Sequence, residues 1–337
     1  MRVLLGVIVL GLLAVPVWAV PIVDGTWDAE YGAAIAVQTV ETGFGDSPGG
    51  PAASVDGGEL DAAYARISGG RLYLLLTGNQ QANFNKMEIF IDSKSGGENV
   101  LSGTPDYDFD ADAGPGEYWI STNMGGMTFD TGFEADYHIF TRWGGGTTPS
   151  AYEVDIVDRA GGGSALVNGN YGAATTGVGT QVQSGSIGVA SGGNNTTPYL
   201  SQPLDFAIDN TNGLGVIGGS AAANQADAAA VLTGIELSVV LADIGNPSVG
   251  DMICIAAMYG NGDHNYLSNQ VLGGLPAPQG NLGGDGAGGF TGTLSGINFN
   301  NFGGEQYFCI EVVPEPTTMA LFGLGMVVLL GLGRRRM

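Results

Sequence analysis

The fold class is decided by the stretch Glu59-Leu-Asp-Ala-Ala-Tyr-Ala-Arg-Ile-Ser-Gly-Gly-Arg-Leu-Tyr-Leu-Leu-Leu-Thr77. Residues rich in Leu, Ile, Tyr and Ala, with period-two alternation, lie on both sides of Ser68-Gly69-Gly70, which is typical of strands with a buried face. The two glycines supply the positive φ angles that a tight hairpin turn needs. The stretch therefore predicts two antiparallel strands, over residues 59–67 and 71–77.

The same pattern recurs along the chain, separated by connections rich in Gly, Asn and Pro. Further strands are predicted over residues 86–92, 137–143, 151–158, 234–241, 252–259 and 306–312. Short strands joined in this way predict an all-β fold, an antiparallel β-sandwich that is jelly-roll-like, with long Gly-rich loops. Residues 43–58 and 161–197 contain few large apolar residues and are predicted to be surface loops or mobile segments. Residues 221–230 alone have a helix-like composition.

Composition excludes several other classes of protein. The chain has 337 residues, of which 60 are glycine, and 44% are hydrophobic. This is too apolar for a disordered chain and too rich in glycine for a helical bundle, and the glycines show no collagen period. The formal net charge is -23. Such a charge repels phosphate backbones, so we expect no nucleic-acid partner and a preference for cations.

The N-terminus is typical of a secretory signal peptide over residues 1–19. Met1-Arg2 is positively charged, Val3–Val17 is apolar, and Val17-Trp18-Ala19 fits a signal-peptidase site. The mature chain is then expected to begin at Val20. The alternative is a single-pass anchor, because residues 3–23 are uncharged.

The C-terminus combines three features in a fixed order. Val313-Pro314-Glu315-Pro316 precedes an uncharged span over residues 317–333, and Arg334, Arg335 and Arg336 follow. A helix over this span would be about 26 Å long, the short limit for crossing a bilayer, and the arginines favour a cytoplasmic end. The tail resembles the PEP-CTERM sorting signals of bacteria with an outer membrane. An ordinary tail anchor is the alternative.

This resemblance implies processing by an exosortase-type membrane enzyme. It also implies export to the cell surface or the extracellular space, with a transient anchor in the inner membrane formed by a C-terminal transmembrane sorting helix. Residues 313–337 are then the sorting signal, and residues 20–312 remain as one β-sandwich domain.

Export bears on the two cysteines, Cys254 and Cys309. An exported chain meets an oxidising compartment, and both residues lie in strand-like runs, so we expect one disulfide bond between them. By loop entropy it would contribute about 4 kcal/mol to stability. Two buried free thiols are the alternative.

Parts of the body resemble family-nine carbohydrate-binding modules and their DOMON-type relatives. The segments that carry the resemblance are residues 24–32, 64–76, 88–92 and 234–251. It implies a sandwich fold, association with polysaccharide through aromatic side chains, and calcium. Trp27, Trp119 and Trp143 are the tryptophans that remain after signal cleavage, and we expect each to pack in the core or at a strand edge.

Residues 106–117 carry the one metal-site pattern with suitable spacing. Asp106-Tyr-Asp-Phe-Asp-Ala-Asp112 places carboxylates at alternate positions, and Glu117 is twelfth from Asp106. The sequence predicts a calcium (Ca2+) site with the ligands Asp106, Asp108, Asp110 and Glu117. Ala111 replaces the glycine of an EF-hand loop, so an EF-hand is excluded. The alternative is a solvated acidic strand.

Catalytic motifs are sparse. His138 and His264 are the only histidines, each expected to be a lone polar residue, and no nucleophile elbow occurs. The sequence therefore predicts an exported, non-catalytic cell-surface or extracellular-matrix protein that associates with polysaccharide. The alternative is a secreted hydrolase with two carboxyl groups facing each other across a cleft.

Overall fold

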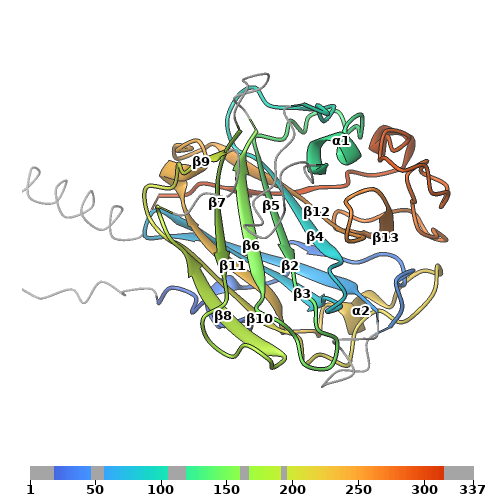
Figure 1. Cartoon of the computed structure of the whole chain (residues 1–337), viewed down its shortest axis with the longest axis horizontal. Helices are drawn as coiled ribbons and strands as arrows, with labels where there is room; N and C mark the ends of the chain where they lie inside the picture. Colours follow the sequence, from blue (N-terminus) through green and yellow to red (C-terminus); the bar gives the residue numbers. More distant parts are fainter. Residues whose placement is uncertain (1–18, 47–56, 105–118, 160–166, 191–195, 315–337) are drawn as a thin grey trace, which may run out of the picture. The chain divides into compact units, whose positions relative to one another are not determined.

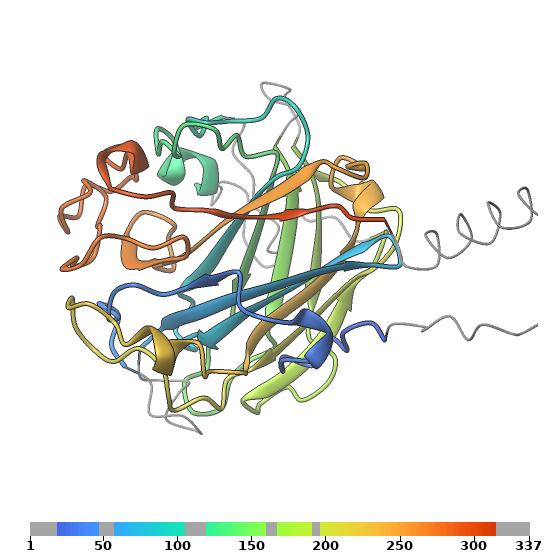
Figure 2. The ribbon, with the colours of Figure 1, turned by 180° about the vertical axis from the view of Figure 1, so that it is seen from behind.

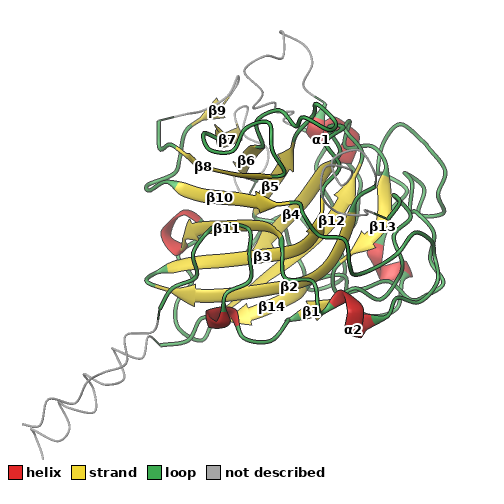
Figure 3. Cartoon of the chain, turned by 90° about the horizontal axis from the view of Figure 1, so that it is seen from below, coloured by secondary structure: helices red, strands yellow, loops and turns green. Residues whose placement is uncertain are grey.

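The computed structural model describes residues 19–46, 57–104, 119–159, 167–190 and 196–314. Within these ranges the chain forms two mainly antiparallel sheets joined by loops, with only short helical turns (Figure 1, Figure 3). The all-β prediction and its two-sheet arrangement are confirmed. A signal peptide is predicted within residues 1–19 and a sorting helix within residues 313–337. Residues 1–18 and 315–337 lie outside the described part of the chain.

The first sheet has six strands in the order β1-β2-β3-β11-β10-β8. Their bounds are Ala36–Val37, Glu59–Ser68, Arg71–Asn79, Gly234–Val240, Leu204–Asp209 and Val182–Ile187. β2 and β3 form the predicted hairpin, in which Ser68 lies opposite Arg71. The turn residues Gly69 and Gly70 have φ angles of 60° and 71°, as the paired glycines predict.

The second sheet has eight strands, and its main path is β13-β12-β4-β5-β6-β7-β9, with β14 also paired to β12. In chain order, β4, β5, β6 and β7 span Lys86–Asp92, Tyr137–Arg142, Glu153–Asp158 and Val167–Ala173. The remaining strands β9, β12, β13 and β14 span Thr196–Thr197, Met252–Gly260, Leu267–Val271 and Phe308–Glu311. The described α-helices are α1, Ile120–Met124, and α2, Gln225–Ala228, and α2 lies inside the segment predicted to be helical.

The main core lies between the two sheets and follows from strand alternation. Leu72, Leu74 and Leu76 of β3 pack in one cluster with Ile89 and Ile91 of β4. Alternate residues of a strand point to opposite faces, so every second side chain of β3 enters this core. Burial of these apolar side chains is the main force that holds the sheets together.

The outer faces of both sheets are also partly covered. On the eight-stranded sheet, Phe90 and Phe140 pack against apolar residues from the loops, including Phe129 and Phe299. On the six-stranded sheet, Tyr64 and other residues of β2 and β3 pack against residues 21–37, which we call the N-terminal segment. Figure 2 shows this part of the chain in dark blue beside the sheet. The structure therefore has three buried clusters within the described residues.

The predicted surface loop over residues 161–197 is wrong for much of its length, because β7, β8 and β9 lie there. Their sequences contain few large side chains because neighbouring groups approach the backbone closely. A Cβ at Gly172 would lie 2.7 Å from Ile187 Cγ1, and one at Gly185 would lie 2.7 Å from Phe206 Cζ. Glycine thus permits close packing within the sheet, although the composition of this segment predicted a loop. In the other predicted loop, residues 47–56 lie outside the described part of the chain.

Candidate functional site: a hydroxyl pocket on the six-stranded sheet

A row of polar side chains crosses the outer face of the six-stranded sheet. Tyr73 of β3 lies opposite Ser238 of β11, and Ser238 lies opposite Asp205 of β10. Asp205 in turn lies opposite Ser186 of β8. Their neighbours Leu72, Leu237 and Phe206 point into the core, so alternation directs this row outward.

Tyr73, Ser238 and Asp205 of this row line a pocket of about 380 Å³. We call this the hydroxyl pocket; its lining residues are Pro21, Val23, Tyr73, Thr175, Thr176, Ser184, Gly185, Asp205, Phe206 and Ser238. Its volume is in the range typical of small-molecule sites. Five of the lining residues carry a hydroxyl group and one carries a carboxylate, so the pocket offers many hydrogen-bond donors and acceptors.

Arg71 organises one end of the row. Its Nε donates to Ser238 Oγ at 2.7 Å, and its Nη2 donates to the backbone oxygens of Ser238 and Pro203 at 2.8 and 2.9 Å. The same Nη2 lies 3.5 Å from Asp205 Oδ2. Since the Asp205 side chain is 51% exposed, its carboxylate is accessible to a ligand, while the planar guanidinium holds its orientation.

The wall made by Pro21 and Val23 belongs to the N-terminal segment, which Glu236 holds in place. Glu236 Oε2 accepts hydrogen bonds from the backbone N–H groups of Asp24 and Gly25, each at 2.9 Å. Its Oε1 accepts from the hydroxyl of Tyr31 at 2.6 Å. Burial raises the pKa of the Glu236 carboxyl to about 7, against the opposing effect of these hydrogen bonds.

A second polar cluster lies buried on the outer face of the other sheet. Glu88 of β4 contacts both histidines of the chain: Oε2 lies 2.8 Å from His138 Nε2, and Oε1 lies 2.6 Å from His264 Nδ1. Burial lowers the pKa of His138 to about 4 and that of His264 well below its ordinary value. Both rings are therefore neutral at pH 7. Through Glu88 they connect the loop after β12, which carries His264, to strands β4 and β5.

This cluster corrects the expectation that the two histidines are lone polar residues. His138 does lie in a strand and His264 in a loop, but they share one carboxylate across a sequence separation of more than 100 residues. Strand alternation indicates that Glu88 and Phe90 share a face, but no local pattern indicates that a distant loop returns to them. All three side chains are shielded from solvent, which suits a structural role.

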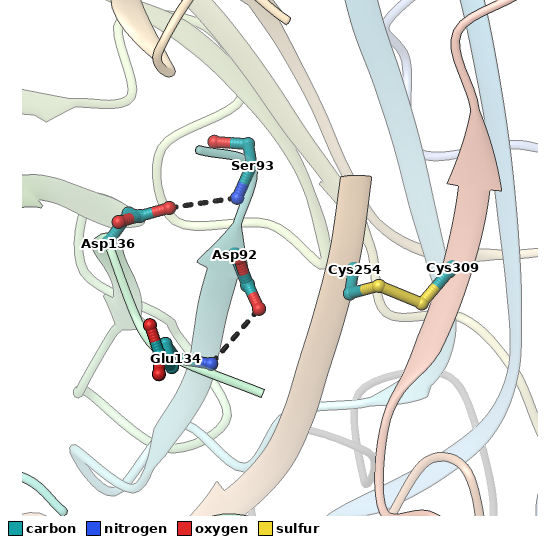
Figure 4. The surroundings of a disulfide bond; sticks show 6 residues. All are labelled: Asp92, Ser93, Glu134, Asp136, Cys254 and Cys309. Carbon is teal, nitrogen blue, oxygen red and sulfur yellow. Dashed lines mark hydrogen bonds between the residues drawn. A yellow bond between two sulfur atoms is a disulfide. The ribbon is translucent and has the colours of Figure 1, made fainter. Parts of the chain in front are cut away.

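The predicted disulfide bond between Cys254 and Cys309 is present (Figure 4). The two residues lie directly opposite each other on β12 and β14, with their Cα atoms 4.0 Å apart.

On its other side Cys254 lies opposite Asp92, whose Oδ2 accepts a hydrogen bond from Glu134 N at 3.0 Å. Nearby, burial raises the pKa of Asp136 to about 6, although its carboxylate accepts from Ser93 N at 2.9 Å.

The tryptophans divide between core and surface. Trp143 is fully buried, and Trp27 packs edge-on against Tyr64, as expected. Trp119 is 62% exposed beside α1, so the expectation of core or strand-edge packing is wrong for this residue. The reason is that α1 is a single short turn, whose apolar contacts are made by Ile120 and Met124.

The other predicted site residues lie mostly outside the described part of the chain. This holds for the calcium ligands Asp106, Asp108, Asp110 and Glu117 and for the sorting residues Glu315, Pro316, Arg334, Arg335 and Arg336. Pro314 is the last described residue. Within the described ranges, no three His, Cys, Asp or Glu side chains are grouped so that they could hold a metal ion. No helix in those ranges is long and apolar enough to span a membrane.

Comparison with known proteins gives one match. Residues 312–336 match the PEP-CTERM protein-sorting motif. No curated protein and no solved structure is significantly similar to the chain. The motif indicates an exported protein that is sorted to the cell surface and processed by an exosortase. The resemblance to family-nine carbohydrate-binding and DOMON-type modules gains no support from these comparisons.

Proposed function

We propose that this protein is a non-catalytic cell-surface or extracellular-matrix protein that binds neutral polysaccharide in the hydroxyl pocket. The observation that carries this proposal is the lining of the pocket, where five hydroxyl-bearing residues and Asp205, with its accessible carboxylate, line a cavity of about 380 Å³. Sugars present several hydroxyl groups on one ring, each able to donate and to accept a hydrogen bond. A lining of hydroxyls and a carboxylate matches both roles.

Charge decides which polysaccharides fit. The chain has a formal net charge of -23, and the lining residue Asp205 forms an ion pair with Arg71, so the pocket offers no unpaired positive charge to an acidic polymer. An acidic polymer would be repelled over the distance at which surface charges act. Neutral polysaccharide, including neutral segments of the cell's own exopolymer, is therefore the expected ligand.

The composition of the pocket favours binding over hydrolysis. Glycosidases use two carboxyl groups on opposite sides of the scissile bond, separated by about 5 to 9.5 Å. Among the described residues that line the hydroxyl pocket, Asp205 is the single carboxylate. A hydrolase acting on polysaccharide is thus the weaker alternative for this site.

We also propose that the uncharged span over residues 317–333 anchors the chain in the inner membrane only until an exosortase acts. The matched motif at residues 312–336 supports the exosortase step, and it begins directly after β14. The β-sandwich domain, including β14, would then be folded before it reaches its site of action.

The binding proposal is tested with exported protein on a panel of neutral polysaccharides, namely dextran, hydroxyethylcellulose and xylan, with alginate as an acidic contrast. Affinity electrophoresis should show retardation by at least one neutral polymer and none by alginate. Asp205→Asn keeps the shape of the side chain but removes its charge, and it should weaken binding by about tenfold, since a hydrogen bond to a charged group contributes about 1.5–3 kcal/mol.

Asp227→Asn is the matched control, because Asp227 is exposed on α2, away from the pocket. It should bind like the wild-type chain. Equal weakening by both substitutions, or no retardation of the wild-type chain by any neutral polymer, would refute the assignment. Release of new reducing ends from a bound polymer would favour the hydrolase alternative.

A further inference from the structure

Phe84, between β3 and β4, has a backbone conformation that bulky residues avoid. Its φ angle is +69°, in the left-handed region where the Cβ of an L-residue crowds the following carbonyl. The residue is nevertheless 54% exposed, so burial does not account for the conformation. Outliers of this kind persist only where the surroundings enforce them, and they are concentrated at binding sites.

Contacts from two other strand connections and from the first residue of β4 hold Phe84 in this conformation. Its backbone N–H donates to the oxygen of Trp143, in the β5–β6 connection, at 2.8 Å. Its carbonyl accepts from Lys86 Nζ at 2.7 Å. From the β12–β13 connection, Gly262 lies so close that a Cβ there would be 3.3 Å from the same carbonyl oxygen. The conformation is therefore built into one end of the sandwich.

The ring itself rests on bare backbone. A Cβ at Gly144 would lie 2.2 Å from Phe84 Cζ, so any side chain at that position would collide with the ring. Glycine at 144 lets the ring lie against the chain, while more than half of the residue stays open to solvent. The tip of the ring therefore lies against Gly144, while the residue remains accessible to solvent.

The loop that carries Phe84 is polar and uncharged, whereas Lys86 contacts the Phe84 carbonyl and Asp263 follows Gly262 in the β12–β13 connection. Asn83 Nδ2 donates to Gln81 Oε1 at 2.7 Å, and Asn83 Oδ1 accepts from the backbone N–H of Asn85 at 3.0 Å. Neither residues 79–85 nor residues 143–150 include an Asp, Glu, Lys or Arg, in a chain whose net charge is -23. An exposed ring flanked by amide groups and free of nearby acidic side chains from its own loop suits a neutral ligand with both hydroxyl groups and apolar C–H faces.

We propose that Phe84 is a stacking platform for one sugar unit of a neutral polysaccharide. The C–H face of a sugar ring carries a slight positive charge and packs on the negative face of an aromatic ring, while amides such as that of Asn83 bind the equatorial hydroxyls. One ring among amides is too small an apolar patch for a stable protein interface. The inference rests on the proposed function and adds a second contact, at strand connections rather than in the hydroxyl pocket.

Phe84→Gly is the decisive substitution, because glycine adopts a positive φ without strain. In affinity electrophoresis with hydroxyethylcellulose and dextran, this variant should bind about tenfold more weakly than the wild-type chain. Its thermal midpoint should be equal to or above that of the wild type, since the strain is relieved. Phe84→Trp, which keeps an aromatic face, should retain binding. Phe290→Gly is the control, because Phe290 is 67% exposed with an ordinary φ, and it should change binding less than twofold.

The outcomes separate this inference from the proposed function. The platform is overturned if Phe84→Gly binds within twofold of the wild type. It is also overturned if Phe84→Gly has a lowered thermal midpoint and Phe84→Trp fails to retain binding. If Asp205→Asn weakens binding while Phe84→Gly does not, the pocket stands and the platform fails. If Phe84→Gly alone weakens binding, the platform stands and the pocket fails. A wild-type chain that binds neither polymer overturns both.

Discussion

Glu236 illustrates how a single buried carboxyl can link the fold to pH. It holds the N-terminal segment through two backbone N–H groups and the Tyr31 hydroxyl, and that segment forms one wall of the hydroxyl pocket. Burial raises its pKa from about 4.5 to about 7. In the pH range between these values the unfolded chain has lost the proton while the folded chain keeps it, so folding becomes less favourable as pH rises.

We predict that Glu236→Gln removes this pH dependence. The contribution of Glu236 is fully present below pH 4.5 and is lost as pH rises through 7, an effect on the order of 3 kcal/mol from the size of the pKa shift. The unfolding free energy of the wild type minus that of the variant should therefore fall between pH 5 and pH 8, as measured by urea denaturation. His138 and Asp136 also titrate in this range, but they are present in both proteins and cancel in the difference.

Glu311→Gln provides the comparison for this measurement, because Glu311 is exposed on β14. The wild type and this variant should differ by a constant amount across the same pH range. A difference between the wild type and Glu236→Gln that stays constant as well would show that Glu236 is ionised in the folded chain at pH 5.

At the scale of elements, β14 depends on one neighbour. It is four residues long, it pairs only with β12 among the described strands, and the Cys254–Cys309 bond joins the two. The matched sorting motif begins directly after β14, at residue 312. The bond therefore fixes to β12 the strand that directly precedes the sorting motif.

We predict that replacing both cysteines by alanine lowers the unfolding free energy by about 4 kcal/mol, the loop-entropy value for a separation of 55 residues. Guanidinium denaturation of the oxidised wild type and of Cys254→Ala with Cys309→Ala measures the loss. The wild type with its disulfide reduced should fall close to the double variant. Matching midpoints for the oxidised wild type and the double variant would contradict the prediction.

The acidic segment that contains Asp106, Asp108, Asp110 and Glu117 carries a separate prediction. If these carboxylates bind calcium in the folded state alone, stability rises with calcium by about 2.7 kcal/mol at a hundredfold excess over Kd. Melting curves in millimolar calcium and in chelator should then differ for the wild type. They should coincide for Asp108→Asn with Asp110→Asn, and a wild type without any shift would leave a solvated acidic face.

At the scale of the whole molecule, the ends and the body have different tasks. The matched motif at residues 312–336 directs sorting, while the acidic sandwich carries both proposed polysaccharide contacts. Its net negative charge keeps such a body soluble and apart from acidic polymers. Export without a permanent anchor would leave both contact surfaces free outside the cell.

We predict that the chain recovered from the cell surface no longer ends at Met337. Intact-mass analysis should show a main species shortened at both ends, with its N-terminus at Val20 and its C-terminus within or before the span 317–333. Cells that lack exosortase activity serve as the control and should accumulate the form with the intact tail. A surface-recovered main species that still ends at Met337 would count against C-terminal processing.

Several features of this protein could be predicted from short stretches of its sequence. The Gly69-Gly70 hairpin, eight strands, the short α2 and the sorting motif all follow from patterns within about ten to 25 neighbouring residues, because turn geometry, side-chain alternation and a short motif are local properties. The disulfide was also predictable, since export and two strand-borne cysteines leave one pairing.

Other features depend on contacts between residues that are distant in the sequence, and these became apparent only in the tertiary structure. Strands β7 and β8 escaped prediction because Gly172 and Gly185 make room for Ile187 and Phe206, which no local pattern shows. The hydroxyl pocket joins Tyr73, Asp205 and Ser238 through the pairing of β3, β11 and β10. The strain at Phe84 arises from loops that are more than 50 residues apart in the sequence. The physical reason is that strand pairing and loop packing are set by burial across the whole sandwich, which local residue patterns do not encode.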